Sequence, residues 1–302
     1  KRKSGLLAPR FSSSAKLGTG FAIPYFWNIG DDKDLTLTPK LYLNENPLLL
    51  AEYRKDFKKS FLTVDTSYTE GYKKKNSKKS KGGRSHFFSN FNMSLIDEDE
   101  KYSNLEINLQ KVSNDTFFKA YDIETSLVEA NQQILENMID LSYQDKDFYL
   151  GLAPSIFEDT KKNGHSKYEY LLPLTIEKKL MTSEKYGFLD LGTDLRIRNF
   201  DTNKQSNILV NNFNWGSKKW LNKLGINSSF EGLVKTVNYE AKNTKDYKNN
   251  RDISEVNSVI GYFADLGLYK NDFINKNLYT LTPKFLLRYA PGHMRDLDNT
   301  TK

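Results

Sequence analysis

Residues 4–39, SGLLAPRFSSSAKLGTGFAIPYFWNIGDDKDLTLTP, predict three extended segments that fold back on one another. In the first segment, Leu7 and Phe11 share one face. The second and third segments alternate apolar residues with their neighbours, and this period of two is typical of a β-strand. The alternating apolar residues are Phe21, Ile23, Tyr25, Trp27, Ile29, Leu35, Leu37, Leu41 and Leu43. Residues 30–34, GDDKD, predict the turn between the last two segments.

Each of the first two segments contains a proline, Pro9 and Pro24. Proline has no backbone N–H group, so it cannot donate to a sheet ladder and is found on edge strands or at bulges. Two neighbouring strands that each carry a proline therefore predict a sheet edge that pairs weakly. The same prolines would also serve to protect such an edge from aggregation.

The composition favours a sheet with one apolar and one polar face. Hydrophobic residues make up 38% of the 302 residues, below the roughly 45–50% typical of globular chains. Aromatic residues are nevertheless frequent, at 13% with 18 Tyr and 19 Phe. We therefore expect a membrane β-barrel rather than a sandwich with a dry core. The sequence has no apolar run of about 18 residues, so no transmembrane helix is predicted.

Charge and cysteine content leave the binding partner open. Cysteine is absent, which excludes a disulfide framework and a thiol nucleophile. The net charge of +7 suits nucleic acid, an anionic membrane surface or an anionic lipid. The chain lacks an initial methionine and ends in a polar stretch. We expect it to be a piece of a longer protein, cut at both ends.

Further along the chain, alternating segments predict about fifteen strands in all. They are expected at residues 48–57, 61–72, 86–96, 102–112, 134–143, 148–157, 168–179, 187–199, 208–215, 224–237, 256–268 and 278–289. Residues 113–133 predict a long loop, and we expect a short helix at 124–135. Short turns that alternate with longer polar loops are typical of an outer-membrane barrel.

The clearest strand is predicted at 187–199, where one face is apolar and the other charged. The apolar face carries Leu189, Leu191, Leu195 and Ile197. The other face carries Asp190, Asp194, Arg196 and Arg198. Four charges cannot lie unpaired in an apolar core, because each would lose several kcal/mol of solvation. We expect this face to line a wet lumen while the leucines face lipid.

Residues 73–84, KKKNSKKSKGGR, predict a solvated loop because like charges repel and glycines permit turns. The lysines concerned are Lys73, Lys74, Lys75, Lys78, Lys79 and Lys81. They suit the phosphates of lipid headgroups or of nucleic acid, although a long exposed barrel loop without such a role is the favoured explanation.

The sequence predicts neither an enzyme nor a cofactor. His86, His165 and His293 lie far apart in the chain, without the spacing of metal ligands. A lipase would need a serine paired with a histidine and an orienting group, and no local motif selects such a serine.

Three motifs of the opening stretch resemble the LptD family of lipopolysaccharide (LPS) assembly proteins, also called organic solvent tolerance proteins. They are RKSGLLAP at 2–9, IPYFWNI at 23–29 and DLTLTP at 34–39. They are similar to the family's RRSGFLxP, LPYYWNI and DATxTP signatures, in the same order. LTPK at 281–284 with RYAPG at 288–292 resembles a later strand of the family's barrel.

The resemblance implies an antiparallel transmembrane β-barrel of the cell outer membrane. Residues 1–302 would form one partial barrel domain, roughly the first half of a barrel of about 26 strands. The periplasmic jelly-roll domain and the closing half of the barrel would be absent. The implied function is a translocon that inserts LPS into the outer leaflet through a lateral gate between the first and last strands, with Pro9 and Pro24 at that gate.

The resemblance also implies partners: LPS itself, an LptE-like plug lipoprotein inside the barrel, and an LptA-like periplasmic bridge that meets the missing amino-terminal domain. Lumen residues, with Arg196 and Arg198 among them, would contact LPS. Two other hypotheses remain open at this stage. One is a generic outer-membrane porin or receptor barrel, and the other is a soluble basic β-protein that binds nucleic acid through the lysine segment.

Overall fold

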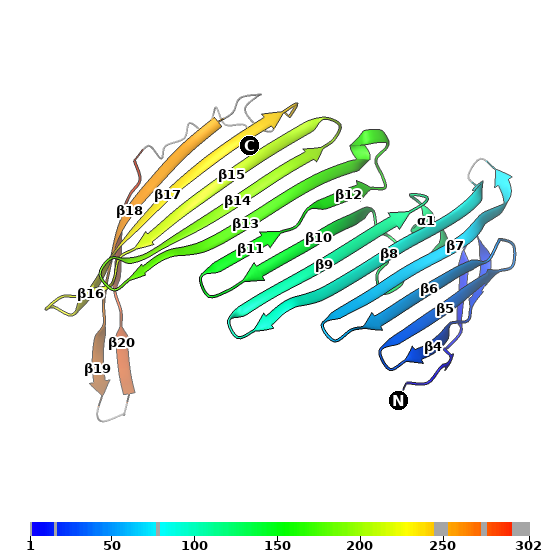
Figure 1. Ribbon diagram of the computed structural model, residues 1–302, viewed down its shortest axis with the longest axis horizontal. Coiled ribbons are helices and arrows are strands. Elements are labelled where there is room, and N and C mark those ends of the chain that lie inside the picture. The colour runs from blue at the N-terminus through cyan, green and yellow to red at the C-terminus, as the bar shows by residue number, and fades with distance from the viewer. Residues whose placement is uncertain (1, 15–16, 77–78, 245–252, 273–276, 292–302) are drawn as a thin grey trace. The chain divides into compact units, whose positions relative to one another are not determined.

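The structure, a computed structural model, describes residues 2–14, 17–76, 79–244, 253–272 and 277–291. Over these residues the chain is mostly antiparallel β-strand, with one short α-helix and one short 3₁₀ helix (Figure 1). This confirms the predicted all-β fold. Neither of the described helices is long and apolar enough to cross a membrane. The chain forms two compact units, of which unit 1 comprises Lys1–Tyr143, Leu152–Leu171 and Phe200–Thr202, and unit 2 comprises the rest.

Unit 1 contains, wholly or mainly, the following elements: β1 (Gly5–Leu6), β2 (Arg10–Ser14), β3 (Gly18–Ala22), β4 (Tyr25–Gly30), β5 (Lys33–Tyr42), β6 (Leu48–Asp56), β7 (Ser60–Asn76), β8 (Lys79–Glu98), β9 (Lys101–Val112), α1 (Phe117–Tyr121), β10 (Ile134–Gln144), β12 (Ser155–Asp159) and η1 (Gly164–Lys167).

Unit 2 contains, wholly or mainly, the remaining elements: β11 (Phe148–Leu152), β13 (Tyr168–Ser183), β14 (Gly187–Phe200), β15 (Lys204–Gly216), β16 (Trp220–Leu221), β17 (Ile226–Lys242), β18 (Ile253–Leu266), β19 (Leu268–Asp272), β20 (Asn277–Leu281) and β21 (Lys284–Tyr289).

The sheet of unit 1 has an apolar face. Strands β4 to β9 pair antiparallel in sequence order, so residues in register form rows across the sheet (Figure 1). Successive side chains of a strand point to opposite faces, so every second row lies on the same face, and one of the two faces is rich in aliphatic and aromatic side chains. The apolar face includes Tyr25, Trp27, Leu35, Leu37, Tyr53, Val64, Phe87, Phe91 and Leu109. Trp27 is 48% and Phe87 46% exposed, so this face meets no second layer of unit 1 at these residues.

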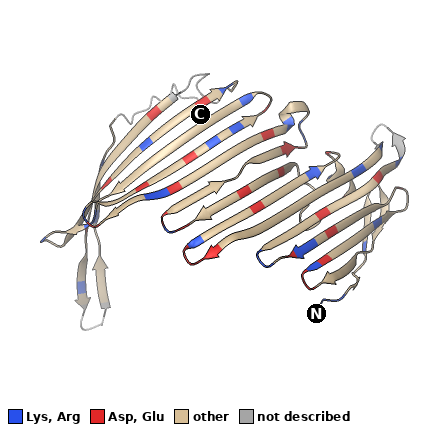
Figure 2. Ribbon diagram, in the orientation of Figure 1, with Lys and Arg blue, Asp and Glu red and all other residues tan. Residues whose placement is uncertain are grey.

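The opposite face, here called the covered face, is more polar. Its members in register include Thr36, Glu52, Asp65 and Phe88, then Leu50, Ser67, His86 and Val112, then Leu48, Thr69 and Arg84. Charged residues of both signs occur along the strands and at their turns (Figure 2).

Residues 113–133, here called the cover, form turns and helix α1 and lie on the covered face. Phe117 and Ile123 are fully buried, and Tyr121 is 1% exposed. They belong to one hydrophobic cluster with Leu48 and Phe88 of the sheet. Helix α1 has only five residues, which is too short to be stable alone, so this aromatic packing holds it in place.

In unit 2, the long strands are β13, β14, β15, β17 and β18 (Figure 1). Strand β15 pairs with β17, β17 with β18, and β18 with β21. Strands β19 and β20 form a separate two-stranded sheet.

Several predicted strands are interrupted where the sequence contains proline. Pro24 separates β3 from β4, Pro154 separates β11 from β12, and Pro283 separates β20 from β21, so each of three predicted strands is two. Pro9 likewise separates β1 from β2. Without an N–H group the proline leaves a gap in the ladder, and strand geometry ends on either side of it.

Two other predictions were wrong in detail. The short helix expected at 124–135 lies instead at Phe117–Tyr121, because the aromatic residues there pack on the covered face. The loop expected at 73–84 is largely a continuation of the β7–β8 hairpin, with strand up to Asn76 and again from Lys79. Gly71 and Gly82 have positive φ angles of 79° and 125°, which only glycine adopts readily, and the hairpin register shifts there.

Candidate functional site

The two prolines predicted at the gate lie where the pairing of the first strands changes, Pro9 between β1 and β2 and Pro24 between β3 and β4. Strand β1 pairs with β4 through Gly5 and Leu6, and β2 pairs with β3 through five residue pairs. Between these ladders, the backbone N–H of Leu7 donates to the carbonyl oxygen of Pro24 at 2.8 Å. Pro24 is buried, whereas Pro9 is exposed. Neither proline can donate to the ladder, so the pairing is interrupted at this level of the sheet.

A hollow of about 530 Å³ lies on the covered face beside this interruption. One part of its lining is apolar and comes from the first strands, with Leu7, Phe11 and Pro24. The other part is charged and includes Lys40 and Glu124. The hollow therefore has an amphipathic lining.

The covered face contains a buried hydrogen-bonded array that the sequence analysis did not anticipate. His86 lies between Ser67, whose Oγ contacts Nδ1, and Asp65, whose Oδ1 lies 2.9 Å from Nε2. The side chains of His86 and Asp65 are 0% and 1% exposed. Phe118 of the cover stacks edge-on against the imidazole, with ring centroids 5.4 Å apart.

These three residue types can perform nucleophilic catalysis when a substrate reaches the serine. Here the cover closes the array, and Ser67 is only 2% exposed. In this arrangement no substrate can reach Ser67, and the array acts as a structural polar core. It is costly, because Oδ2 of Asp65 has no hydrogen-bond partner among the described residues.

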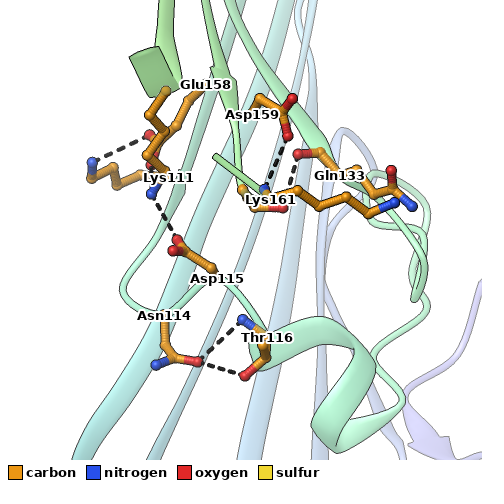
Figure 3. Close-up of polar contacts among 10 residues, drawn as sticks. Lys111, Asn114, Asp115, Thr116, Gln133, Glu158, Asp159 and Lys161 are labelled. Carbon is orange, nitrogen blue, oxygen red and sulfur yellow. Dashed lines mark hydrogen bonds and ion pairs between the residues drawn. The ribbon is translucent and has the colours of Figure 1, made fainter. Parts of the chain in front are cut away.

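The start of the cover is bound by a cluster of ion pairs, shown in Figure 3. Nζ of Lys167 lies 2.7 Å from Asp115 at the start of the cover and 2.7 Å from Glu158 on β12. Lys111 lies 3.5 Å from the other oxygen of Glu158. Lys167 and Glu158 are 16% and 5% exposed, so this pair is largely shielded from water, whereas Asp115 and Lys111 are exposed. Burial lowers the pKa of Lys167, but the hydrogen bonds to Asp115 and Glu158 outweigh it and raise that pKa well above 10.5.

The end and the middle of the cover are held by further polar contacts. The backbone N–H and hydroxyl of Thr160 both donate to the carbonyl oxygen of Gln133, at 2.8 and 2.9 Å. In the middle, the hydroxyl of Ser126 donates to Glu52 at 2.7 Å. Thr160 and Lys167 belong to one loop, so the same loop binds both ends of the cover.

Strand β14 bears the charged residues predicted for the lumen, with Asp190 and Asp194 on one face. Asp194 accepts a hydrogen bond from Thr175 at 3.0 Å, and both aspartates line a hollow of about 600 Å³ in unit 2. Arg196 is exposed and Arg198 partly exposed. The apolar residues of the other face, Leu189, Leu191, Leu195 and Ile197, are all partly exposed.

The predicted lysine patch is only partly described. Lys73 and Lys81 are exposed near the ends of β7 and β8, and the backbone N–H of Lys73 donates to Glu45 at 2.9 Å. Lys74, Lys75 and Lys79 lie in these strands, and Lys78 falls outside the described residues.

The histidines do not form a metal site in the part of the chain that the structure describes. His86 lies on β8 and His165 in the exposed η1 turn, while His293 falls outside the described residues. The described residues contain no group of three or more side chains that could hold a metal ion.

The class of protein follows from the strands. They are antiparallel with one apolar and one polar face, and prolines interrupt the first strand pair. The chain is therefore an all-β protein with a barrel-like fold.

Comparison with known proteins identifies the particular relatives. The chain is 25% identical over 341 aligned positions to the LPS-assembly protein LptD of Legionella pneumophila, covering 98% of this chain and 38% of that protein. It is 31% identical over 144 residues to the protein of the same name from Nitrosococcus oceani, covering 48% of this chain and 18% of that protein. LptD of Shewanella oneidensis is 24% identical over 204 residues, covering 66% of this chain and 25% of that protein. The predicted resemblance to LptD is therefore confirmed.

The chain spans between about a fifth and two fifths of the length of these relatives. No family model matches the chain. Among solved structures, a bacterial polysaccharide outer membrane secretin covers 90% of both chains at 9% identity and a TM-score of 0.30, which is too remote to bear on fold or function.

Proposed function

We propose that this chain is part of an LPS-assembly barrel in the outer membrane, which inserts LPS into the outer leaflet through a lateral gate at its first strands. The similarity to LptD over 98% of the chain carries this proposal. In this arrangement the apolar face contacts lipid, and the covered face is turned toward the lumen. LPS is the substrate. An LptE-like plug and an LptA-like bridge are the partners that the resemblance implies.

The gate is proposed at Pro9 and Pro24. A molecule with acyl chains and a charged headgroup must leave the lumen sideways, and each missing ladder hydrogen bond weakens the seam by about 0.5–1.5 kcal/mol, or more in lipid. The amphipathic hollow beside Pro24 supports this place of exit, because its lining offers apolar and charged surfaces together.

Depletion of the protein in living cells, followed by labelling of surface LPS, tests the function. Loss of newly labelled LPS is expected, while small solutes should still cross the outer membrane. A generic porin predicts the reverse, with solute uptake falling and surface LPS unchanged. That result would reject the translocon.

Replacing Pro9 and Pro24 together by alanine tests the gate. The variant regains two backbone donors, so the seam should tighten by about 1–3 kcal/mol and export of LPS should fall. Pro47→Ala is the matched control, since Pro47 lies exposed in the turn between β5 and β6. Equal export of LPS by the double variant and the control would show that the two prolines have no role in the gate.

We also propose that exposed lysines of the β7–β8 hairpin bind the phosphates of LPS at the cell surface. Lys73→Glu combined with Lys81→Glu should reduce surface LPS without changing the amount of folded protein. Unchanged surface LPS would leave this hairpin without a role in transport.

A further inference from the structure

The connection between β15 and β17 exposes large apolar side chains. It comprises residues 217–225, SKKWLNKLG, includes the two-residue strand β16, and extends beyond the end of β15 (Figure 1). It is here called the projecting turn. Trp220, Leu221 and Leu224 are 41%, 66% and 79% exposed. Contiguous exposed apolar side chains are characteristic of surfaces that meet a partner or a membrane.

Hydrogen bonds fix the backbone of the projecting turn. Oδ1 of Asn222 accepts from the backbone N–H groups of Leu224 and Ile226, at 2.9 and 3.0 Å. The backbone N–H of Ser217 donates to the carbonyl oxygen of Phe230 at 2.8 Å, and its Oγ accepts from the N–H of Phe230 at 2.7 Å. The leucines are therefore presented outward by a defined conformation.

Aromatic contacts connect the projecting turn to the apolar face of unit 2. The ring of Trp220 lies 5.4 Å from that of Phe230, which lies 5.4 Å from that of Tyr262 on β18. Phe230 and Val234 share one face of β17 and are each 42% exposed. Aromatic residues near the ends of barrel strands are typical of the boundary between hydrocarbon and headgroups.

The polar side chains of the projecting turn are mainly cationic. Lys218, Lys219 and Lys223 are exposed, and residues 215–226 contain no Asp or Glu. These three lysines form no ion pair within the described part of the chain. A segment that interleaves lysines with Trp and Leu suits a bilayer interface, where the apolar groups enter the acyl layer and the ammonium groups stay among phosphates.

The order of the connections along the chain indicates which leaflet is involved. The projecting turn follows β15, and the connections in the same alternating series follow β4, β6, β8, β10 and β13, when β11 and β12 are counted as one interrupted strand. Each of those five has two or three residues, whereas the other series includes the cover. Short connections of outer-membrane barrels face the periplasm, where the leaflet consists of phospholipid.

We propose that the projecting turn is an interfacial anchor. Trp220, Leu221 and Leu224 enter the acyl layer of the periplasmic leaflet, and the three lysines bind the phosphates of anionic phospholipids such as phosphatidylglycerol. This inference rests on the outer-membrane location in the proposed function. It does not depend on LPS as the transported molecule, because the anchor would serve any barrel.

Fluorescence quenching tests the position of the projecting turn. The chain has no cysteine, so Leu221→Cys can carry a single NBD fluorophore on the protein reconstituted in vesicles of phosphatidylethanolamine and phosphatidylglycerol. Lipids with a spin label close to the headgroup should quench this fluorophore by at least about half, and aqueous iodide should quench it little. Asn163→Cys is the control, because Asn163 is exposed in the eight-residue loop between β12 and β13, and iodide should quench its label strongly.

A lysine variant tests the choice of lipid. The quenching of Leu221→Cys by spin-labelled phosphatidylglycerol, relative to spin-labelled phosphatidylcholine, measures the local excess of anionic lipid. Lys218→Gln combined with Lys219→Gln should lower this excess about fivefold, the factor expected for about one lysine at an anionic surface. Lys161→Gln combined with Lys162→Gln removes the same charge from the loop between β12 and β13 and should leave the excess unchanged.

The outcomes separate this inference from the proposed function. In protein that floats with the vesicles, quenching at position 221 by iodide alone would place the turn in water, and protection from both quenchers would indicate a protein contact; either result overturns the anchor. Equal excess in the two double variants, or displacement of phosphatidylglycerol by added LPS, would overturn the assigned lipid. Protein that does not float would overturn the membrane location and the anchor together, whereas unchanged surface LPS after depletion would reject the translocon alone.

Discussion

Replacing His86 by leucine tests whether the buried array is organised as described. Asp65 is fully buried, and His86 is the hydrogen-bond partner of its Oδ1. In His86→Leu, Oδ1 of this buried carboxyl group loses that partner, and Oδ2 has none among the described residues. Removal of one member of a buried pair costs about 3–5 kcal/mol, so we expect a loss of stability in this range.

A double variant separates the cost of the unpartnered carboxyl group of Asp65 from the loss of packing. Asp65→Leu combined with His86→Leu replaces the pair by apolar side chains of similar size, which is often close to neutral. The double variant should therefore be more stable than His86→Leu alone, by roughly 2–4 kcal/mol. His165→Leu is the control, because His165 is exposed in the η1 turn and its loss should change stability by less than about 0.5 kcal/mol.

The measurement is the urea concentration at which half of the protein, folded in detergent micelles, is unfolded. Folded and unfolded forms are distinguished by their different mobility on gels run without heating. A midpoint unchanged in His86→Leu would refute the buried pair. A double variant as unstable as His86→Leu would show that the loss of stability comes from altered packing and not from the unpartnered carboxyl group of Asp65.

Three other predictions follow from the backbone, the cover and the two faces. Gly71→Ala should cost about 1–3 kcal/mol, since its φ is 79° and the added methyl group would collide with the facing strand; Gly5→Ala, with open space around it, is the control in the same urea titration. The pKa of Lys167 is raised in the fold, so its ion pairs with Asp115 and Glu158 should persist as pH rises from 7 past 10 and weaken only beyond, which the difference in urea midpoint between the parent protein and Lys167→Met measures; a difference that shrinks below pH 10 would contradict the bonding of this lysine. Leu37→Lys should impair insertion into lipid by about 2–4 kcal/mol, whereas Thr36→Lys on the covered face should insert normally, and equal insertion of both in a vesicle assay would reject the assignment of faces.

The alternation of apolar and polar residues predicted most of the sheet. In a strand with one apolar and one polar face, every second side chain lies on the same face. The segment 187–199 is the clearest case, and it is strand from Gly187 to Phe200. The breaks at Pro9 and Pro24 follow from the missing N–H group, although Pro39 and Pro173 lie within β5 and β13 without ending the strand.

Position within the sheet explains what the sequence did not reveal. Ser67, His86 and Asp65 form no local motif, and they meet only because β7 and β8 pair in one particular register. The prediction placed the short helix at the wrong residues, because a five-residue helix forms through packing and not through propensity. The aromatic pair Phe117 and Phe118 was the sequence feature that indicated its position. The basic segment 73–84 was expected to be a loop because its charges repel, yet the β7–β8 pairing extends into it.

The cover buries residues contributed by β6, β7 and β8, which are separate until these strands have paired. It therefore has no completed surface on which to dock while the sheet is still assembling. Closure must come late in folding, after the hairpins are aligned, and protection of His86 from solvent marks a molecule in which that alignment is finished. A chain with one hairpin out of register would be left with Phe117 and Phe118 unburied.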